Sequence, residues 1–225
     1  MRWFYGLLGA VAVVAAVLIW KGSRSGRAAL TPAGGDGSPV AISAADSAFP
    51  GFMLGSDTAP VEVTEYADFQ CPHCGEFAIV QFPTIREQLI ATGRLRWRFR
   101  EFPLNFAWSR MSALAAECAG EQGKFWEMVD AMFQRQSDWG QSTKNPAGLF
   151  RDLGRGTGVD VTKYDACMDS QRYAGRIELS RQEGVARNVT GTPTFFVRGA
   201  PLDTRRFGNS DAFKTLVDSL TSGRR

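Results

Sequence analysis

The chain has 225 residues, of which 44% are hydrophobic and 22% are charged. This is ordinary globular composition, and it excludes a wholly disordered, collagen-like or mucin-like protein. Four of the 26 basic residues lie within the first 27 positions, where there is no acidic residue, so the rest of the chain has a balance of 22 − 23 = −1. A nucleic-acid-binding domain carries its positive excess on the folded part, so this distribution argues against nucleic acid as a partner.

The chain contains one histidine, His73, and four cysteines, at positions 71, 74, 118 and 167. A Ser-His-Asp triad, a His-rich metal site and a cysteine nucleophile with a distant histidine base each need a histidine elsewhere in the sequence. Because the sequence has no second histidine, these three kinds of site are excluded.

The N-terminal region predicts a membrane tether. Residues 3–20 form an uncharged apolar run of 18 residues between Arg2 and Lys21, which is about the minimum length of a membrane span. A cleaved signal peptide is the alternative, and positive residues on both sides leave the orientation open. We predict a retained anchor over residues 1–21, a Gly- and Ser-rich flexible linker over 22–48, and a folded domain over 49–222.

The folded part begins with a pattern of strand, helix and strand. Residues 61–69 are rich in β-branched and aromatic side chains and predict a strand. Residues 75–91 carry apolar side chains at three- and four-residue spacing, which predicts a helix despite Pro83. Residues 95–102 alternate apolar side chains with arginines, which predicts a half-exposed strand whose arginines form a solvated face rather than an anion site.

The remaining segments complete an α/β pattern. Residues 106–188 are mostly helical, and their apolar stripes are expected to be core. Residues 194–197 predict another strand, and residues 211–220 a closing helix. The order predicts a mixed α/β sheet that is interrupted by a helical insertion at about residues 105–188.

The candidate chemistry lies in Cys71-Pro72-His73-Cys74, where the strand over 61–69 ends and the next helix begins. Cys71 is expected at the N-cap, where its side chain accepts hydrogen bonds from helix N–H groups, and Pro72 at the first helical position. A Cys71 thiolate there lies at the positive end of the helix dipole, which lowers its pKa. Cys74 follows one turn later, within disulfide reach. His73 adds a positive charge or an N–H donor, or else is an exposed residue without a role.

The other two cysteines bear on the alternative of a zinc site. Cys71 and Cys74 could be half of a zinc site, because a C-x-x-C pair supplies two of its ligands. The other half would have to come from Cys118 and Cys167, which are isolated from each other, so we expect no metal. They are either buried free thiols or a disulfide, and an oxidising compartment favours the disulfide. Closing a loop of about 50 residues would stabilise the protein by about 4 kcal/mol. We predict a structural role for this pair.

Two further positions are candidate site residues. Glu65 lies six residues before Cys71, and if it is buried beneath the helix start its raised pKa suits proton exchange with Cys74. The alternative is a strand carboxylate open to solvent. Thr192-Pro193 precedes the TFFV strand, where a proline either starts the strand or follows a cis bond. The backbone of Thr192 is then placed to pair with an extended substrate.

Three separated motifs carry a family resemblance: Phe69-Gln70-Cys71-Pro72-His73-Cys74, residues 120–126 (GEQGKFW) and Gly191-Thr192-Pro193. Together they resemble the DsbA-like branch of the thioredoxin superfamily. The resemblance implies a thioredoxin fold with an inserted helical domain, outside the cytoplasmic membrane. It implies that Cys71 exchanges with substrate, that Cys74 resolves the mixed disulfide, and that Pro193 is cis and faces the pair. Glu65 resembles the buried acid of thioredoxin-like proteins, and the extra cysteine pair is similar to that of membrane-tethered and actinobacterial-type relatives.

Two departures from the family pattern concern its chemistry. Many relatives carry a histidine shortly after the Phe-Trp pair, where this chain has Val129, which is expected to pack in the core instead. Thr192 before the expected cis-proline also occurs in reducing and isomerising branches, which leaves the direction of electron flow open.

The leading hypothesis is a membrane-tethered, extracytoplasmic thiol-disulfide oxidoreductase that introduces disulfides into exported proteins. Thiolate stabilisation at Cys71 favours the oxidase, because stabilising the reduced form makes the disulfide an oxidant. The resemblance suggests reoxidation by a quinone-linked membrane partner of the DsbB or vitamin-K-epoxide-reductase type, and no organic cofactor is implied. One alternative is a reductase or isomerase on the same fold. Another is a tethered binding or chaperone module whose cysteine pair is only structural.

Overall fold

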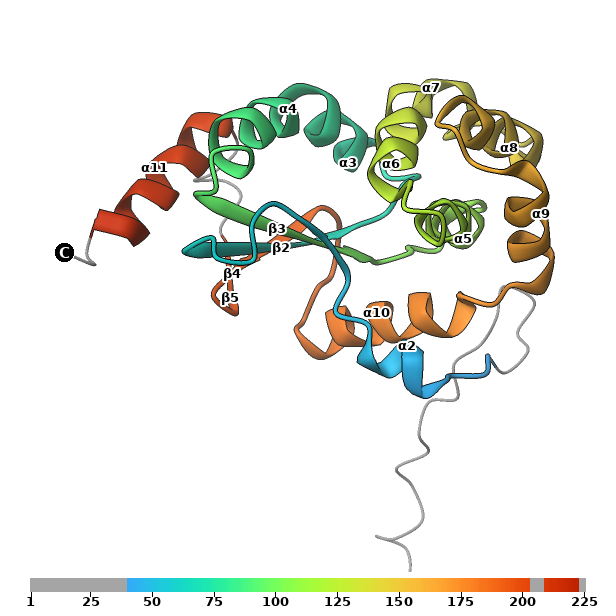
Figure 1. Ribbon diagram of the computed structural model, residues 1–225, viewed down its shortest axis with the longest axis horizontal. Helices are drawn as coiled ribbons and strands as arrows, with labels where there is room; N and C mark the ends of the chain where they lie inside the picture. Colours follow the sequence, from blue (N-terminus) through green and yellow to red (C-terminus); the bar gives the residue numbers. More distant parts are fainter. Residues whose placement is uncertain (1–39, 203–208, 223–225) are drawn as a thin grey trace, which may run out of the picture.

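The computed structural model describes residues 40–202 and 209–222, and Figure 1 shows how their elements are arranged. At its centre is a five-stranded sheet in the order β1-β3-β2-β4-β5. β2 and β3 pair in parallel, whereas the other neighbouring strands pair antiparallel. The predicted mixed sheet is therefore confirmed. The strands are β1 (Phe52–Leu54), β2 (Val61–Ala67), β3 (Leu95–Glu101), β4 (Thr194–Val197) and β5 (Ala200–Pro201).

A helical segment crosses from β2 to β3 and begins at Pro72. It consists of α3 (Pro72–Glu76), the π-helical turn η1 (Phe77–Gln81), α4 (Phe82–Ile85) and a second π-helical turn η2 (Arg86–Ile90). The predicted helix over 75–91 is thus present, but it starts earlier and is not a regular α-helix. Pro83 lies in α4, between the two π turns, and it has no N–H with which to continue the regular hydrogen-bond ladder.

Helices cover both faces of the sheet (Figure 1). On one face, the segment from α3 to η2 and helix α11 (Ser210–Ser222) pack over Val61, Val63 and Trp97 in one apolar cluster. On the other face, α10 (Ala174–Ala186) lies beside β3. Residue Glu65 continues the alternation of Val61 and Val63, so it belongs to the face that α3 covers.

The predicted helical insertion lies between β3 and β4, at one end of the sheet (Figure 1). Its buried side chains form one apolar cluster, and Phe69, Cys71 and Cys74 belong to the same cluster. The cysteine motif therefore lies at the boundary between the sheet domain and the insertion. The helices of the insertion are α5 (Ser109–Gly120), α6 (Phe125–Gln134), α7 (Gln136–Trp139), α8 (Ala147–Gly156), α9 (Val161–Ser170) and α10.

The arginines of β3 do not form a solvated face, and this prediction was wrong for its C-terminal half. Arg100 is only 5% exposed, and its guanidinium lies 2.6 Å from Glu183 of α10. Arg98 pairs with the same carboxylate at 3.4 Å. Because α10 covers this part of the strand, the charges are neutralised within the fold rather than by water.

The structure also differs from the prediction of a flexible linker over residues 22–48. Helix α2 (Ala44–Ala48) lies inside the segment 22–48 that the composition predicts as linker. Ser43 caps it, with Asp46 completing a reciprocal capping box, and α2 packs on α10. The predicted anchor over residues 1–21 lies outside the described residues. Within residues 40–202 and 209–222, no helix is long and apolar enough to cross a membrane.

Candidate active site

Cys71 occupies the N-cap of α3 and Pro72 its first turn, as the sequence predicts. The backbone at Cys71 is extended, with φ −71° and ψ 122°, and its carbonyl accepts the first hydrogen bond of the helix from the Gly75 N–H at 3.1 Å. Both thiols are free in this structure. Cys71 is 4% exposed and Cys74 is fully buried, so Cys71 is the more accessible of the two cysteines.

The sulfur of Cys71 does not make the predicted capping hydrogen bond in the reduced protein. As a neutral thiol it donates instead to the carbonyl oxygen of Thr192, at 3.3 Å. The Thr192–Pro193 peptide bond is cis. Thr192 and Pro193 are both half-buried. The loop before β4 therefore contacts the cysteine motif, although the two are far apart in the sequence.

The two thiols have pKa values that are shifted in opposite directions. A hydrogen bond with the Cys74 thiol, helped by the backbone N–H groups of Cys74 and His73, lowers the pKa of Cys71 to about 5 against the effect of burial. Burial, the hydrogen bond to Cys71 and the charge on Cys71 raise the pKa of Cys74 well above its ordinary value. At neutral pH the pair thus holds one thiolate, at Cys71, and one thiol, at Cys74.

Glu65 is buried beneath the start of α3, not open to solvent. Its carboxyl accepts a hydrogen bond of 2.9 Å from the indole Nε1 of Trp97. Burial raises the pKa of Glu65 to about 8, and the hydrogen bond from Trp97 opposes this shift. The carboxyl is close enough to Cys74 for its charge to contribute to the raised pKa of that thiol. A protonated acid therefore lies beside the buried cysteine at neutral pH.

His73 lies on the outer side of α3. Its side chain is 81% exposed, and its Nδ1 atom is 3.8 Å from the Glu76 carboxylate. Pro72 is also exposed. The side chains of the two central residues of the motif are therefore exposed to solvent, whereas the carbonyl that accepts from the Cys71 thiol belongs to Thr192.

Three polar residues around the motif were not singled out as site residues in the sequence. The buried carboxylate of Asp68 accepts hydrogen bonds from the Gln70 N–H, the Leu104 N–H and the Ser109 hydroxyl. Gln70 and Gln136 are the other two, and both connect the motif to the helical insertion. Asp68 and Gln70 could have been found from the sequence, because both are polar residues at the end of an apolar strand, directly before Cys71. Gln136 follows the motif by 65 residues, and nothing near it in the sequence marks it.

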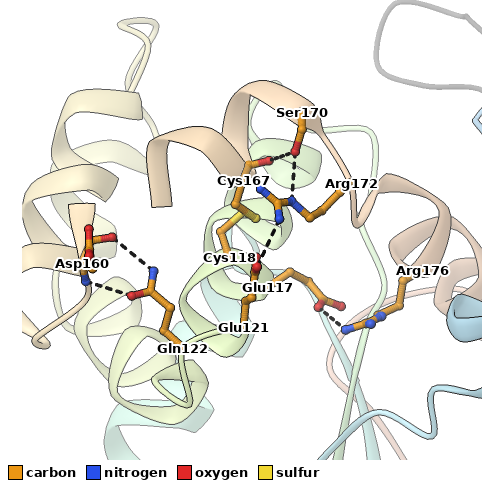
Figure 2. Close-up of a disulfide and its surroundings, with 9 residues drawn as sticks. All are labelled: Glu117, Cys118, Glu121, Gln122, Asp160, Cys167, Ser170, Arg172 and Arg176. Carbon is orange, nitrogen blue, oxygen red and sulfur yellow. Dashed lines mark hydrogen bonds and ion pairs between the residues drawn. A yellow bond between two sulfur atoms is a disulfide. The ribbon is translucent and has the colours of Figure 1, made fainter. Parts of the chain in front are cut away.

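Cys118 of α5 and Cys167 of α9 are joined by a disulfide (Figure 2). Both residues are fully buried. Figure 2 shows two ion pairs near it, Arg172–Glu121 and Arg176–Glu117. The nitrogen–oxygen distances within these pairs are 3.1 and 2.9 Å. The Cys118–Cys167 disulfide belongs to the helical insertion. Among the described residues, no hydrogen bond joins it to Cys71.

Comparisons with known proteins agree with this arrangement. A family model described as Thioredoxin matches residues 48–219. Disulfide bond formation protein D of Bacillus subtilis is 28% identical over 175 residues, which cover 76% of this chain and 78% of that protein. The crystal structure of oxidised BdbD from Bacillus subtilis has a TM-score of 0.67 and 28% identity, and the match covers 75% of this chain and 91% of that chain.

A second group of relatives is much longer. The Na(+)/H(+) antiporter NhaA 3 of Salinispora tropica is 39% identical over 149 residues, which cover 65% of this chain and 21% of the antiporter. The chain thus spans about a fifth of the length of that relative, and the likeness concerns one segment of the antiporter.

Proposed function

Because the chain belongs to the thioredoxin family, in its DsbA-like branch of thiol:disulfide oxidoreductases, we propose that it introduces disulfides into exported proteins through Cys71 and Cys74. The observation that carries this proposal is that the pKa values of two cysteines, one helical turn apart, are shifted in opposite directions. The pKa of Cys71 is lowered to about 5, and that of Cys74 is raised well above its ordinary value.

The proposed reaction consists of two thiol-disulfide exchanges. A substrate thiolate attacks the Cys71 sulfur of the Cys71–Cys74 disulfide, and a mixed disulfide forms while Cys74 leaves as a thiolate. A second substrate thiolate then attacks the substrate sulfur of the mixed disulfide and releases the Cys71 thiolate. Two electrons pass from the substrate dithiol to the cysteine pair. Cys71 is a good leaving group in the second step because its pKa is low.

Glu65 donates a proton to the buried sulfur of Cys74 and later accepts it back. When Cys74 leaves, its thiolate forms in an apolar site where an unpaired charge is costly. The carboxyl of Glu65, with its pKa of about 8, is protonated at neutral pH and gives its proton to this thiolate. During reoxidation the same carboxylate takes the proton back. Glu65 thus acts as general acid and general base for Cys74.

The oxidising direction follows from the stabilised thiolate. A group that stabilises the reduced form of a cysteine pair raises the reduction potential of the disulfide. The hydrogen bonds that lower the pKa of Cys71 act on its thiolate, which exists only after reduction. The exchange of electrons with a substrate dithiol is therefore driven toward substrate oxidation.

Substrate binding is assigned to the backbone beside Cys71. The Thr192 carbonyl oxygen lies 3.3 Å from the Cys71 sulfur and accepts a hydrogen from it only while Cys71 is a neutral thiol. In the mixed disulfide the sulfur has no hydrogen to donate, so this carbonyl becomes available to a substrate N–H. An extended substrate segment on Thr192 and Pro193 thus resembles an added strand.

The location and the reoxidant are further parts of the proposal. A buried disulfide between Cys118 and Cys167 supports an oxidising compartment outside the cytoplasmic membrane. The apolar run over residues 3–20 supports a tether to the cell membrane. The electrons from substrate would then pass to a quinone-linked membrane partner of the DsbB or vitamin-K-epoxide-reductase type.

The test is the redox equilibrium of the full chain against glutathione. The thiols are alkylated after equilibration, and the state of Cys71 and Cys74 is read by mass spectrometry. We expect a potential near roughly −120 mV, the value of DsbA. A potential near roughly −270 mV, that of thioredoxin, would reject the oxidase and support a reductase.

A further inference from the structure

Gln136, the first residue of α7, lies against the peptide groups around Cys71. Its side-chain Nε2 donates hydrogen bonds to the carbonyl of Phe69 at 2.7 Å and to the carbonyl of Cys71 at 2.9 Å. One amide group thus spans the loop that connects β2 with α3. Sixty-five residues separate Gln136 from Cys71, so the contact joins the helical insertion to the motif.

A second glutamine, Gln70, also joins the loop to the helical insertion, but its side chain extends from the loop. Gln70, which lies in the loop itself, donates through Nε2 to the carbonyl of Gly140 at 2.9 Å, and its Oε1 accepts from the Trp108 N–H at 2.6 Å. The loop is therefore held from both directions. One glutamine reaches from the loop into the insertion, and the other reaches from the insertion to the loop.

The fit of Gln136 depends on a glycine in the active-site helix. A Cβ atom at Gly75 would lie 2.3 Å from Oε1 of Gln136 and 2.8 Å from its Cδ. Real Cβ atoms essentially never come this close to a non-bonded heavy atom, so any larger residue at this position displaces the Gln136 amide. The residue after Cys74 and the glutamine of α7 are therefore complementary.

From these contacts we propose that Gln136 is a positioning residue, which fixes the peptide groups before and after Cys71 and thereby sets how strongly the disulfide oxidises substrates. The proposal rests on the proposed function and assigns part of its tuning to the helical insertion. The Cys71 carbonyl is anchored by Gln136 and by the helix bond from Gly75. With that carbonyl fixed, the backbone N–H groups of His73 and Cys74 are held where they stabilise the Cys71 thiolate once the sulfur has lost the hydrogen that it donates to Thr192.

The dipole of the Gln136 amide group also favours the Cys71 thiolate. The two hydrogens on Nε2 are the positive end of the amide dipole, and they point at the loop that carries Cys71. A positive dipole end near a thiolate favours the charged form over the disulfide, which carries no charge. Removing the amide therefore weakens the reduced state more than the oxidised state.

The test compares Gln136→Met with Gln134→Met in the full chain. Methionine keeps the length of glutamine without its donors. Gln134 is an exposed glutamine two residues earlier, with no hydrogen bond found to the described residues. For each protein we would measure the glutathione equilibrium of Cys71–Cys74 and the pH midpoint of Cys71 alkylation. For Gln136→Met we expect a shift of roughly threefold to tenfold toward the disulfide, the effect of about one hydrogen bond, and a higher alkylation midpoint. Gln134→Met should match the wild type in both.

Gly75→Ala provides an independent route to the same change. Its methyl group displaces the Gln136 amide, so it should shift both readouts in the same direction. In the double variant Gly75→Ala/Gln136→Met the shift should be no larger than in Gln136→Met alone, because both changes remove one interaction. Additive shifts, or a Gln136→Met protein with the wild-type equilibrium and midpoint, would overturn the proposal.

Failure of the proposed function would give a different result. If the protein is a reductase, the wild type itself shows a reducing potential, and Gln136→Met still raises the alkylation midpoint relative to the wild type. If the positioning role is wrong, the wild type is oxidising and Gln136→Met leaves both quantities unchanged.

Discussion

The Sγ atom of Cys71 lies 3.3 Å from the carbonyl oxygen of Thr192, although 121 residues separate the two in the sequence. The cis bond between Thr192 and Pro193 belongs to the loop that enters β4, and β4 pairs with β2. The strand that leads into the motif and the strand that follows the proline are thus neighbours. In the proposed reaction, every exchange at the Cys71 sulfur therefore takes place beside this carbonyl, whereas Cys74 is fully buried.

The first prediction concerns the separate roles of the two sulfurs. Reduced Cys74→Ser, incubated with an excess of a disulfide-containing peptide, should accumulate a mixed disulfide on Cys71, because the variant lacks the Cys74 thiol that would resolve it. Cys71→Ser should form essentially none, because the remaining thiol at Cys74 is fully buried and its pKa is raised. Intact-mass measurement without reductant distinguishes the two products. Absence of a mixed disulfide in both variants would instead favour a binding module whose cysteine pair is only structural.

The second prediction is the pH dependence of Cys71 reactivity. Only the thiolate is alkylated, so the rate for the reduced protein should rise with pH around a midpoint near 5 and then remain constant through neutral pH. The measurement is the rate of iodoacetamide modification at a series of pH values, with the modified residue identified by mass spectrometry. A midpoint near the ordinary value of 9.0 would show that neither the Cys74 thiol nor the backbone N–H groups stabilise the thiolate.

The same pKa shift predicts how the two redox forms differ in stability. Because the pKa of Cys71 is lowered in the folded state, the thiolate stabilises the reduced protein fully above pH 9.0, and this contribution is lost as the pH falls toward about 5. The oxidised protein has no such group. The free energy of unfolding of the reduced form, relative to the oxidised form, should therefore increase between these two pH values. Urea unfolding of both forms at several pH values measures this difference, and a constant difference would contradict the prediction.

The local features of the site could be predicted from sequence. The strand that leads to Cys71, the N-cap position and Pro72 in the first helical turn all depend on residues within a short segment. Backbone propensities act over this distance, so composition and spacing contain the information. The buried position of Glu65 follows from strand alternation together with the helix above it.

The contacts that cross between segments could not be predicted in this way. Arg100 alternates with apolar residues as a solvated side chain would, and only the packing of α10 reveals that it is buried against Glu183. Gln136 has no local signal, because its partners are backbone carbonyls, which every residue has. Such contacts depend on which segments the fold brings together, and the amino-acid pattern of one segment does not specify them.

A further prediction is that Glu65→Gln stabilises the oxidised protein at neutral and alkaline pH. The folded-state pKa of Glu65 is raised from 4.5 to about 8, so its stabilising contribution is full below pH 4.5 and is lost as the pH rises toward 8. Glutamine stays neutral and can still accept from the Trp97 indole. The two proteins should have similar unfolding free energies near pH 4.5 and diverge by about 1.4 kcal/mol per pH unit, to roughly 3 kcal/mol at pH 7.

Urea unfolding of the oxidised proteins at several pH values measures this divergence. Glu62→Gln is the matched control, because Glu62 is a half-buried carboxylate on the same strand, β2, but on its opposite face. It should follow the wild-type pH dependence. Parallel curves for Glu65→Gln and the wild type would show that Glu65 is ionised in the folded protein at neutral pH, and would remove it from the proposed proton exchange.

The last prediction concerns the disulfide between Cys118 and Cys167. The double variant Cys118→Ala/Cys167→Ala should be destabilised by about 4 kcal/mol on the chain-entropy model, because the bond closes a loop with a sequence separation of 49 residues. Alanine is preferable to serine here, since both positions are fully buried and a hydroxyl would lack a partner. Urea unfolding measures the loss, with Cys71 and Cys74 kept oxidised in both proteins.

Burial also predicts which disulfide is reduced first. In glutathione that reduces the Cys71–Cys74 bond, Cys118–Cys167 should remain intact in the folded wild type, because a thiolate cannot reach its fully buried sulfurs without local unfolding. In denaturing urea the same reagent should reduce both bonds. Reduction of both at similar rates in the folded protein would show that α5 and α9 separate readily, and the pair would then be open to exchange rather than structural.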